Sequence, residues 1–166
     1  MTGNALFRDL LHTIAEVSIT LAGFSGVVFV LGRRAQGRFT KTEKNGLFHL
    51  LLTSCGTTIV ALSVAAILAG STDETVAWRI GCALVGVFVL FGASRAMIEE
   101  KSGEHSLPRF VAWPIPVVAT ILALVNIVVA FGLIVRLAPI ACLTLLIYLI
   151  LVSVLYFASL LVTDKG

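Results

Sequence analysis

Five long apolar stretches occupy most of this chain, at approximately 12–32, 47–70, 76–98, 111–135 and 139–162. Each reaches the roughly 20 residues that a helix needs to cross the hydrocarbon of a bilayer. Lipid offers no partner to an unpaired backbone group, so spans of this kind must be helical. The sequence therefore predicts an all-α fold: one polytopic transmembrane bundle of about five spans, covering residues 1–166 as a single domain.

The composition excludes an ordinary soluble fold, because 58% of the residues are hydrophobic and only 13% are charged. Soluble domains carry about 25% charged residues. The three cysteines, Cys55, Cys82 and Cys142, each lie in an apolar run and form no CxxC pair. We expect them to be buried as small apolar groups, with no disulfide framework, metal site or cofactor.

The basic residues predict the orientation. Nine of the 12 Lys and Arg residues fall on one side of the five-span layout, and Arg8, Arg79 and Arg136 fall on the other. The more basic side should be cytoplasmic, which places the N-terminus outside and the C-terminus inside a bacterial inner membrane. The short connections that carry these charges suit an anionic lipid surface and do not predict binding of double-stranded nucleic acid.

The first connection, 33–46, holds most of the cytoplasmic charge: Arg33, Arg34, Arg38, Lys41 and Lys44. Its expected roles are topology and contact with anionic lipid. An alternative is a docking site for a regulatory protein or for an anionic ligand such as a nucleotide. The glycines nearby form neither a Walker loop nor a dinucleotide fingerprint.

Glu16 is the most informative residue, because a carboxylate inside a span costs about 2.5–3.5 kcal/mol on insertion scales and normally faces protein or water. One reading pairs it with Arg8 or Arg136, which are on the same predicted side. Another places it in a ring of carboxylates at the mouth of a pore in a homo-oligomer, where it attracts cations. A third has its side chain extend to the membrane interface, since Glu16 lies about one turn from the outer edge of the span.

Polar and small residues define two further sets of candidates. Those that could line a polar path are Glu16, Thr20 and Gly23 in the first span, His49, Thr53 and Thr57 on one face of the second, and Asn126 in the fourth. The alternative for the hydroxyls and the amide is hydrogen bonding within the bundle. The candidates for close helix packing are Ser18, Ala22, Gly26, Cys82, Gly86, Gly92 and Ala96.

The segment 14–34, IAEVSITLAGFSGVVFVLGRR, resembles the opening of small, uncharacterised bacterial multi-span membrane proteins. The shared pattern is one glutamate, a Leu-x-Gly-Phe-x-Gly-Val core and a basic end, here Glu16, Leu21–Val27, Arg33 and Arg34. Proteins of this type look like the membrane effectors of bacterial antiphage systems, such as the Hailong channel component. The resemblance, over about an eighth of the chain, implies an oligomeric channel that depolarises the infected host and relies on a partner as its sensor.

Three functional hypotheses follow. The leading one is a homo-oligomeric ion channel or pore-forming effector, and the alternative is a non-conducting scaffold or subunit of a larger membrane complex. The third is a transporter or an intramembrane enzyme. No nucleophile elbow, HExxH motif or paired aspartates appear in the sequence, so we expect no enzymatic activity.

Overall fold

The computed structural model describes residues 2–36, 41–101 and 113–162. Its helices are α1 (Thr2–Gln36), α2 (Lys41–Gly70), α3 (Glu74–Lys101), α5 (Pro114–Ala130) and α6 (Ala138–Val162), with a short 3-10 helix η1 (Val135–Leu137) before α6. All regular structure within these residues is helical, which confirms the all-α prediction.

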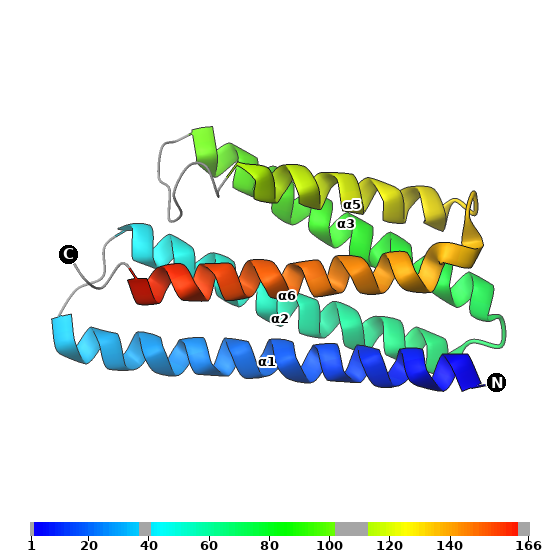
Figure 1. Ribbon diagram of the computed structural model, residues 1–166, viewed down its shortest axis with the longest axis horizontal. Coiled ribbons are helices and arrows are strands. Elements are labelled where there is room, and N and C mark those ends of the chain that lie inside the picture. The colour runs from blue at the N-terminus through cyan, green and yellow to red at the C-terminus, as the bar shows by residue number, and fades with distance from the viewer. Residues whose placement is uncertain (1, 37–40, 102–112, 163–166) are drawn as a thin grey trace.

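The five helices alternate in direction along one axis of the molecule (Figure 1). The end where α1 begins, which we call the first end, also carries the α2–α3 turn and the α5–α6 connection. The end where α6 finishes, the second end, carries the last turns of α1 and α3. The described helices therefore make five passes along the bundle, and α1 starts at the opposite end from the one where α6 finishes.

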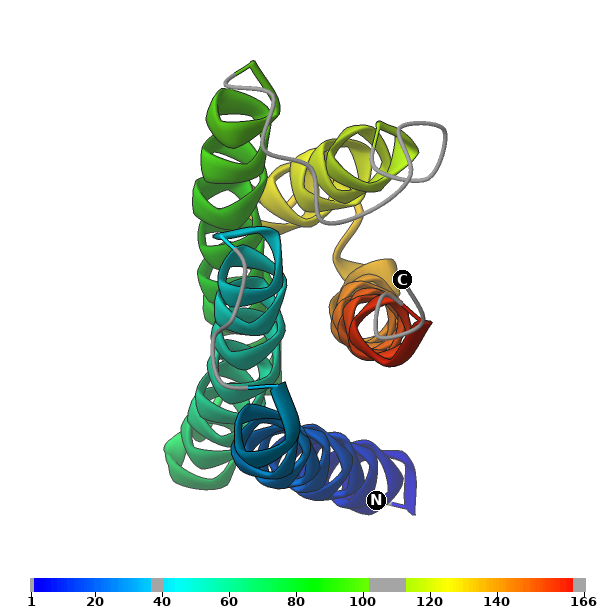
Figure 2. The same cartoon turned by 90° about the vertical axis from the view of Figure 1, so that its left-hand side faces the viewer.

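Helices α2 and α6 form the centre of the bundle. Helix α1 packs against both of them on one side, while α3 and α5 pack against each other and against α6 on the other side. Viewed along the helices in Figure 2, α1 and α5 lie at opposite edges. The core between them is made largely of buried aliphatic side chains, among them the fully buried Val64, Val85, Leu145 and Leu146. Helix α1 thus has a large surface that its own chain leaves uncovered.

Four of the helices are long and apolar enough to cross a membrane: α1, α2, α3 and α6. Helix α5 has only 17 residues, a length of about 25 Å at 1.5 Å per residue. That is slightly less than the hydrocarbon thickness of about 30 Å. The described residues therefore form an all-helical bundle that suits a membrane protein, with α5 as a shorter apolar helix.

The predicted limits of the fourth span, 111–135, are wrong at the C-terminal side, where α5 ends at Ala130. The chain turns at Gly132, whose φ of 89° lies in the left-handed region that ends many helices. Its N–H donates to the Val129 carbonyl at 2.9 Å. The apolar run continues through the turn, so hydropathy alone does not detect the end of the helix. At the other side, residues 111–112 lie outside the described residues.

Much of the predicted polar connection 33–46 is helical, because α1 continues to Gln36 and α2 begins at Lys41. The segment before residue 12, predicted either as an interfacial helix or as part of the first span, is continuous with α1. A hydropathy pattern measures only the part of a helix that contacts lipid. Lysine, arginine and glutamine are good helix formers, so the helices extend beyond the hydrocarbon.

Candidate functional site

One face of α1 carries a line of polar side chains that points away from the rest of the bundle. Asp9, Thr13, Glu16, Thr20 and Gly23 are all exposed. The intervals between them alternate between four and three residues, which places them on one seam of the helix. His12, one turn before Glu16, is exposed beside this seam. We call these residues the polar seam of α1.

The opposite face of α1 is buried against α2 and α6. Ser18 is 1% exposed and Ala22 is 6% exposed, so these predicted packing residues lie in the helix interface. Gly26 is half-buried, and a Cβ placed on it would have no neighbour within 4 Å. Small residues therefore let α1 approach the bundle over Ser18 and Ala22. Because this face packs against the bundle, the polar seam on the opposite face of α1 lies on the outside.

The polar seam is unusual among the outward surfaces of this molecule. Along the middle of α2, α3, α5 and α6, the exposed side chains are apolar apart from Thr144; examples are Ile59, Leu84, Ile121 and Leu151. Apolar outward faces are what lipid requires. The Thr13 and Thr20 hydroxyls donate to the Asp9 and Glu16 carbonyls of their own helix at 2.9 and 2.7 Å. The Glu16 carboxylate has no such partner within α1 and requires a different neighbour, either water or protein.

Within the described residues, Glu16 forms no ion pair with Arg8 or Arg136. Arg8 turns toward α2, where its Nη2 donates to the Leu68 carbonyl at 2.6 Å. Arg136 is exposed on η1. The predicted tie between Glu16 and these arginines is therefore absent from the protomer. Arg8 instead satisfies a carbonyl in the last turn of α2, where the helix dipole favours a cation.

The polar line of α2 faces the inside of the bundle. Thr57 is fully buried and donates to the Thr53 carbonyl at 2.6 Å, while Thr53 donates to the His49 carbonyl at 2.8 Å. Across the interface, the hydroxyl of Ser153 on α6 donates to the Thr53 hydroxyl at 2.8 Å. The hydroxyls of this line therefore form hydrogen bonds within the bundle, which is the alternative to lining a polar path.

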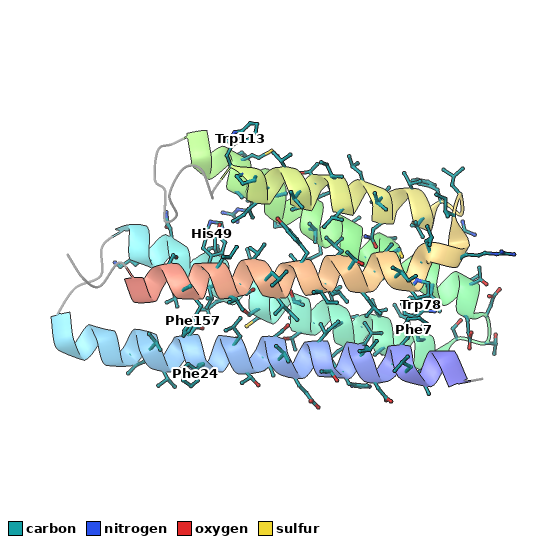
Figure 3. The ribbon with its side chains drawn as sticks, in the orientation of Figure 1. Phe7, Phe24, His49, Trp78, Trp113 and Phe157 are labelled. Carbon is teal, nitrogen blue, oxygen red and sulfur yellow. The ribbon has the colours of Figure 1, made fainter. Side chains whose placement is uncertain are left out.

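His49 lies near the second end, where its ring stacks on Tyr156 of α6 with centroids 5.5 Å apart and planes 15° apart. Figure 3 shows His49 on the inner side of α2, away from Phe24 on α1. A cavity of about 250 Å³ adjoins His49, Thr53, Tyr148 and Tyr156. The structure therefore does not bring His49, Thr53 and Thr57 together with the polar seam.

Asn126 is 1% exposed and joins α5 to α6. Its Nδ2 donates to the Leu122 carbonyl at 3.0 Å in its own helix and to the Ala141 carbonyl at 3.1 Å in the next. Tyr148 of α6 likewise donates to the Ile115 carbonyl of α5 at 2.7 Å. Both groups tie the hairpin of α5 and α6 together, at a distance from α1 across the bundle (Figure 2).

The predicted packing residues of α3 divide into two groups. Cys82 is fully buried, and a Cβ on Gly86 would lie 3.1 Å from Ile127 and 3.2 Å from the Ala123 carbonyl. A Cβ on Gly92 would have no neighbour within 4 Å, and Ala96 is half-buried. The sequence analysis did not select Gly56, where a Cβ would overlap the Phe88 ring. No spacing rule distinguishes these positions, because each depends on what the next helix places opposite.

The basic connection remains a prediction. Arg38 lies outside the described residues, and so do the side chains of Arg33, Arg34 and Lys41. Lys44 is exposed at the start of α2. Within the described residues, no group of three His, Cys, Asp or Glu side chains is placed to hold a metal ion.

The comparisons with known proteins found no match to this chain among family models, curated proteins or solved structures. The functional argument therefore rests on the chain itself. Its most distinctive feature is the polar seam, of which the sequence analysis found Glu16, Thr20 and Gly23 but not Asp9 and Thr13. The alternating spacing of four and three residues could have identified Asp9 and Thr13 in the sequence. Only the structure shows that the seam points outward, because it shows which face of α1 is buried.

Proposed function

We propose that this protein is the subunit of a homo-oligomeric ion channel in which the polar seams of several α1 helices surround a central path. The observation that supports the proposal is the exposed line through Asp9, Thr13, Glu16, Thr20 and Gly23, opposite the buried face of α1. A monomer would present this line to lipid.

The free-energy cost of leaving a carboxylate against lipid favours assembly. Glu16 against hydrocarbon costs about 2.5–3.5 kcal/mol, and each subunit carries one such group. In a closed ring the seams face one axis, where water can hydrate the carboxylates. A ring of carboxylates at a pore mouth attracts cations, so the channel should prefer them to anions.

The spacing of the seam suits a bundle of α1 helices. The same alternation of four and three residues continues through Val27 and Val30, both 56% exposed. A seam of this period packs helices with a slight left-handed twist. Because the seam is polar before Gly23 and apolar after it, the path would have a hydrated half and an apolar half. An apolar constriction closes a pore by excluding water, which suits a channel that rests closed.

The cellular role belongs to the same proposal. The first span resembles the opening of small bacterial multi-span membrane proteins, and proteins of that type look like antiphage effectors, which suggests an effector channel in the inner membrane. Exposed Lys44 and its basic neighbours in sequence would then meet the regulatory partner or an anionic ligand. The scaffold alternative uses the same seam differently, as a dry surface that a second protein covers.

The first test measures conductance of the purified protein in planar bilayers, with Glu16→Gln against Glu74→Gln as a matched control. Glu74 is exposed at the α2–α3 turn and lies off the seam. We expect Glu16→Gln to reduce cation-over-anion selectivity several-fold and Glu74→Gln to leave it unchanged. If the wild-type oligomer fails to conduct under every condition, or if the folded protein is a monomer, the channel proposal is wrong.

The second test distinguishes a seam that lines a water-filled path from a seam that another protein covers. Thr20→Cys lies on the seam, and Ile59→Cys lies on the outward face of α2, where it is 65% exposed to surroundings that should be lipid. A water-soluble thiol reagent should modify Thr20→Cys and block the current, and it should not affect Ile59→Cys. Protection of Thr20→Cys in a complex with another protein would favour the scaffold.

A further inference from the structure

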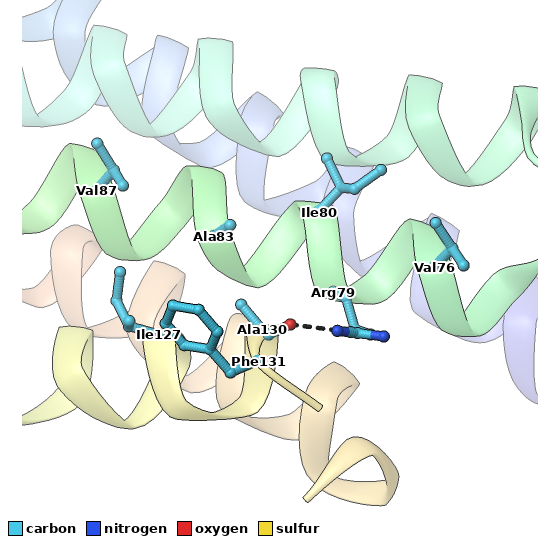
Figure 4. Close-up of a pocket in the computed structure, with 8 residues that line it drawn as sticks. All are labelled: Val76, Arg79, Ile80, Ala83, Val87, Ile127, Ala130 and Phe131. Carbon is cyan, nitrogen blue, oxygen red and sulfur yellow. Dashed lines mark hydrogen bonds between the residues drawn. The ribbon is translucent and has the colours of Figure 1, made fainter. Parts of the chain in front are cut away.

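An open groove runs along the outside of the bundle between α3 and α5, near the first end (Figure 4). Val76, Ile80, Ala83 and Val87 of α3 form one wall, and Ile127 and Phe131 of α5 form the other. Its volume is about 600 Å³, and Arg79 is the only charged residue in its lining. A cation set in an apolar groove on the outside of the bundle is a specific feature that the proposed channel does not account for.

The position of Arg79 is defined by the end of α5. Its Nε donates to the Ala130 carbonyl at 2.9 Å, as Figure 4 shows. The guanidinium lies against Gly132, where a Cβ would come within 3.3 Å of Cζ and Nη2. The buried polar atoms that lack a hydrogen-bond partner among the described residues include none of the Arg79 nitrogens. The terminal nitrogens are therefore either accessible or paired, and the bond through Nε holds the guanidinium at the mouth of the groove.

Apart from the Ala130 carbonyl and the end of the α5 dipole, the lining of the groove offers this charge no acidic partner. Asp73, the carboxylate at the start of α3, already accepts from the backbone N–H groups of Thr75 and Val76 at 2.9 and 3.3 Å. Glu74 is exposed in the first turn, and no carboxylate lines the groove. Charge complementarity therefore calls for an anion on Arg79 and an apolar chain beside it. An arginine fork matches the geometry of a phosphate group well.

We infer that this groove binds one anionic phospholipid, with its phosphate on Arg79 and an acyl chain along Ile80, Ala83 and Val87. The depth is appropriate, because Arg79 lies in the second turn of α3, close to where lipid headgroups would be. Ile80 and Val87 are 45% and 60% exposed, so the groove opens sideways to the bilayer, from which a lipid can enter. This site is independent of the proposed ion path on α1, at the other side of the bundle.

Native mass spectrometry of the protein in mixed phosphatidylglycerol and phosphatidylcholine micelles tests the site with two pairs of variants. Arg79→Gln removes the cation, and Arg136→Gln removes an exposed arginine at the same end as its control. Ala83→Leu fills the groove without removing the Arg79 bond, and Ala66→Leu adds the same bulk at an exposed position of α2. The second pair still decides the question if Arg79→Gln fails to fold.

We expect the wild type, Arg136→Gln and Ala66→Leu to retain phosphatidylglycerol in preference to phosphatidylcholine. Arg79→Gln and Ala83→Leu should each lower that retention at least five-fold, with the protein remaining folded and in the same oligomeric state as the wild type. Equal retention of the two lipids by the wild type would overturn the inference. So would Ala83→Leu retaining as much phosphatidylglycerol as Ala66→Leu.

Discussion

Glycines with the same sequence spacing differ in how closely the neighbouring helix approaches them. Gly86 and Gly92 are both glycines of α3 with four-residue partners. Gly86 faces Ile127 and the Ala123 carbonyl of α5 at contact distance, whereas Gly92 has open space. Close approach of α3 and α5 therefore depends on Gly86, because a backbone carbonyl cannot move aside as a flexible side chain can.

Gly86→Ala should lower the free energy of unfolding by about 1 kcal/mol, since overpacking costs about 1–3 kcal/mol and alanine returns up to about 1 through helix propensity. Gly92→Ala meets no neighbour and should be neutral or stabilising by up to about 1 kcal/mol. Unfolding of the purified protein in mixed micelles with increasing dodecyl sulfate measures both. Equal effects of the two substitutions would contradict the packing that we describe.

The ends of two helices show a common device at the scale of the element. At the first end, Arg8 donates to Leu68 in the last turn of α2, and Arg79 donates to Ala130 at the end of α5. Both cations lie where the helix dipole is negative and where carbonyls lack a partner in their own helix. Gly132 completes the end of α5, because its positive φ reverses the chain toward η1.

Gly132→Ala should lower the free energy of unfolding by about 1–2 kcal/mol, because a Cβ is disfavoured in the left-handed region. Gly70→Ala is the matched control, since Gly70 ends α2 with no neighbour within 4 Å of an added Cβ and no positive φ. The control should change stability by less than about 0.5 kcal/mol. The same unfolding assay applies, and a Gly132→Ala variant as stable as the wild type would show that the turn adapts.

At the scale of the whole molecule, the five described helices run along the bundle axis in alternating directions. Exposed Lys44 at the start of α2 and exposed Glu74 at the start of α3 therefore mark opposite ends. The distribution of basic residues predicts that the second end, which holds Lys44 and Arg95, faces the cytoplasm.

A membrane-impermeant maleimide should label Glu74→Cys in intact cells and should label Lys44→Cys only after permeabilisation. The unmodified chain is the background control, because Cys82 and Cys142 are buried and Cys55 is half-buried. Labelling of both variants from the same side would contradict the odd-pass arrangement. Labelling with the sides reversed would contradict the orientation but leave the arrangement unchanged.

The sequence by itself determined the class of the molecule. Lipid forbids unpaired backbone groups, so long apolar stretches had to become helices, and their number set the alternation that the structure has. It also identified Glu16, because a carboxylate in a span is costly wherever the span is placed. These conclusions need only local composition, since each concerns one segment and its solvent.

The tertiary structure alone decided which way each helix faces and what stands opposite it. It bonded Arg8 to α2 and not to Glu16, and it ended α5 at Ala130 inside an apolar run. It also paired the Thr53 hydroxyl with Ser153 of α6, while Thr57 bonds within α2. It also turned Asp9, Thr13 and Glu16 outward as one seam. The physical reason is that hydrogen bonding and packing depend on neighbours distant in the chain, whose approach no local pattern encodes.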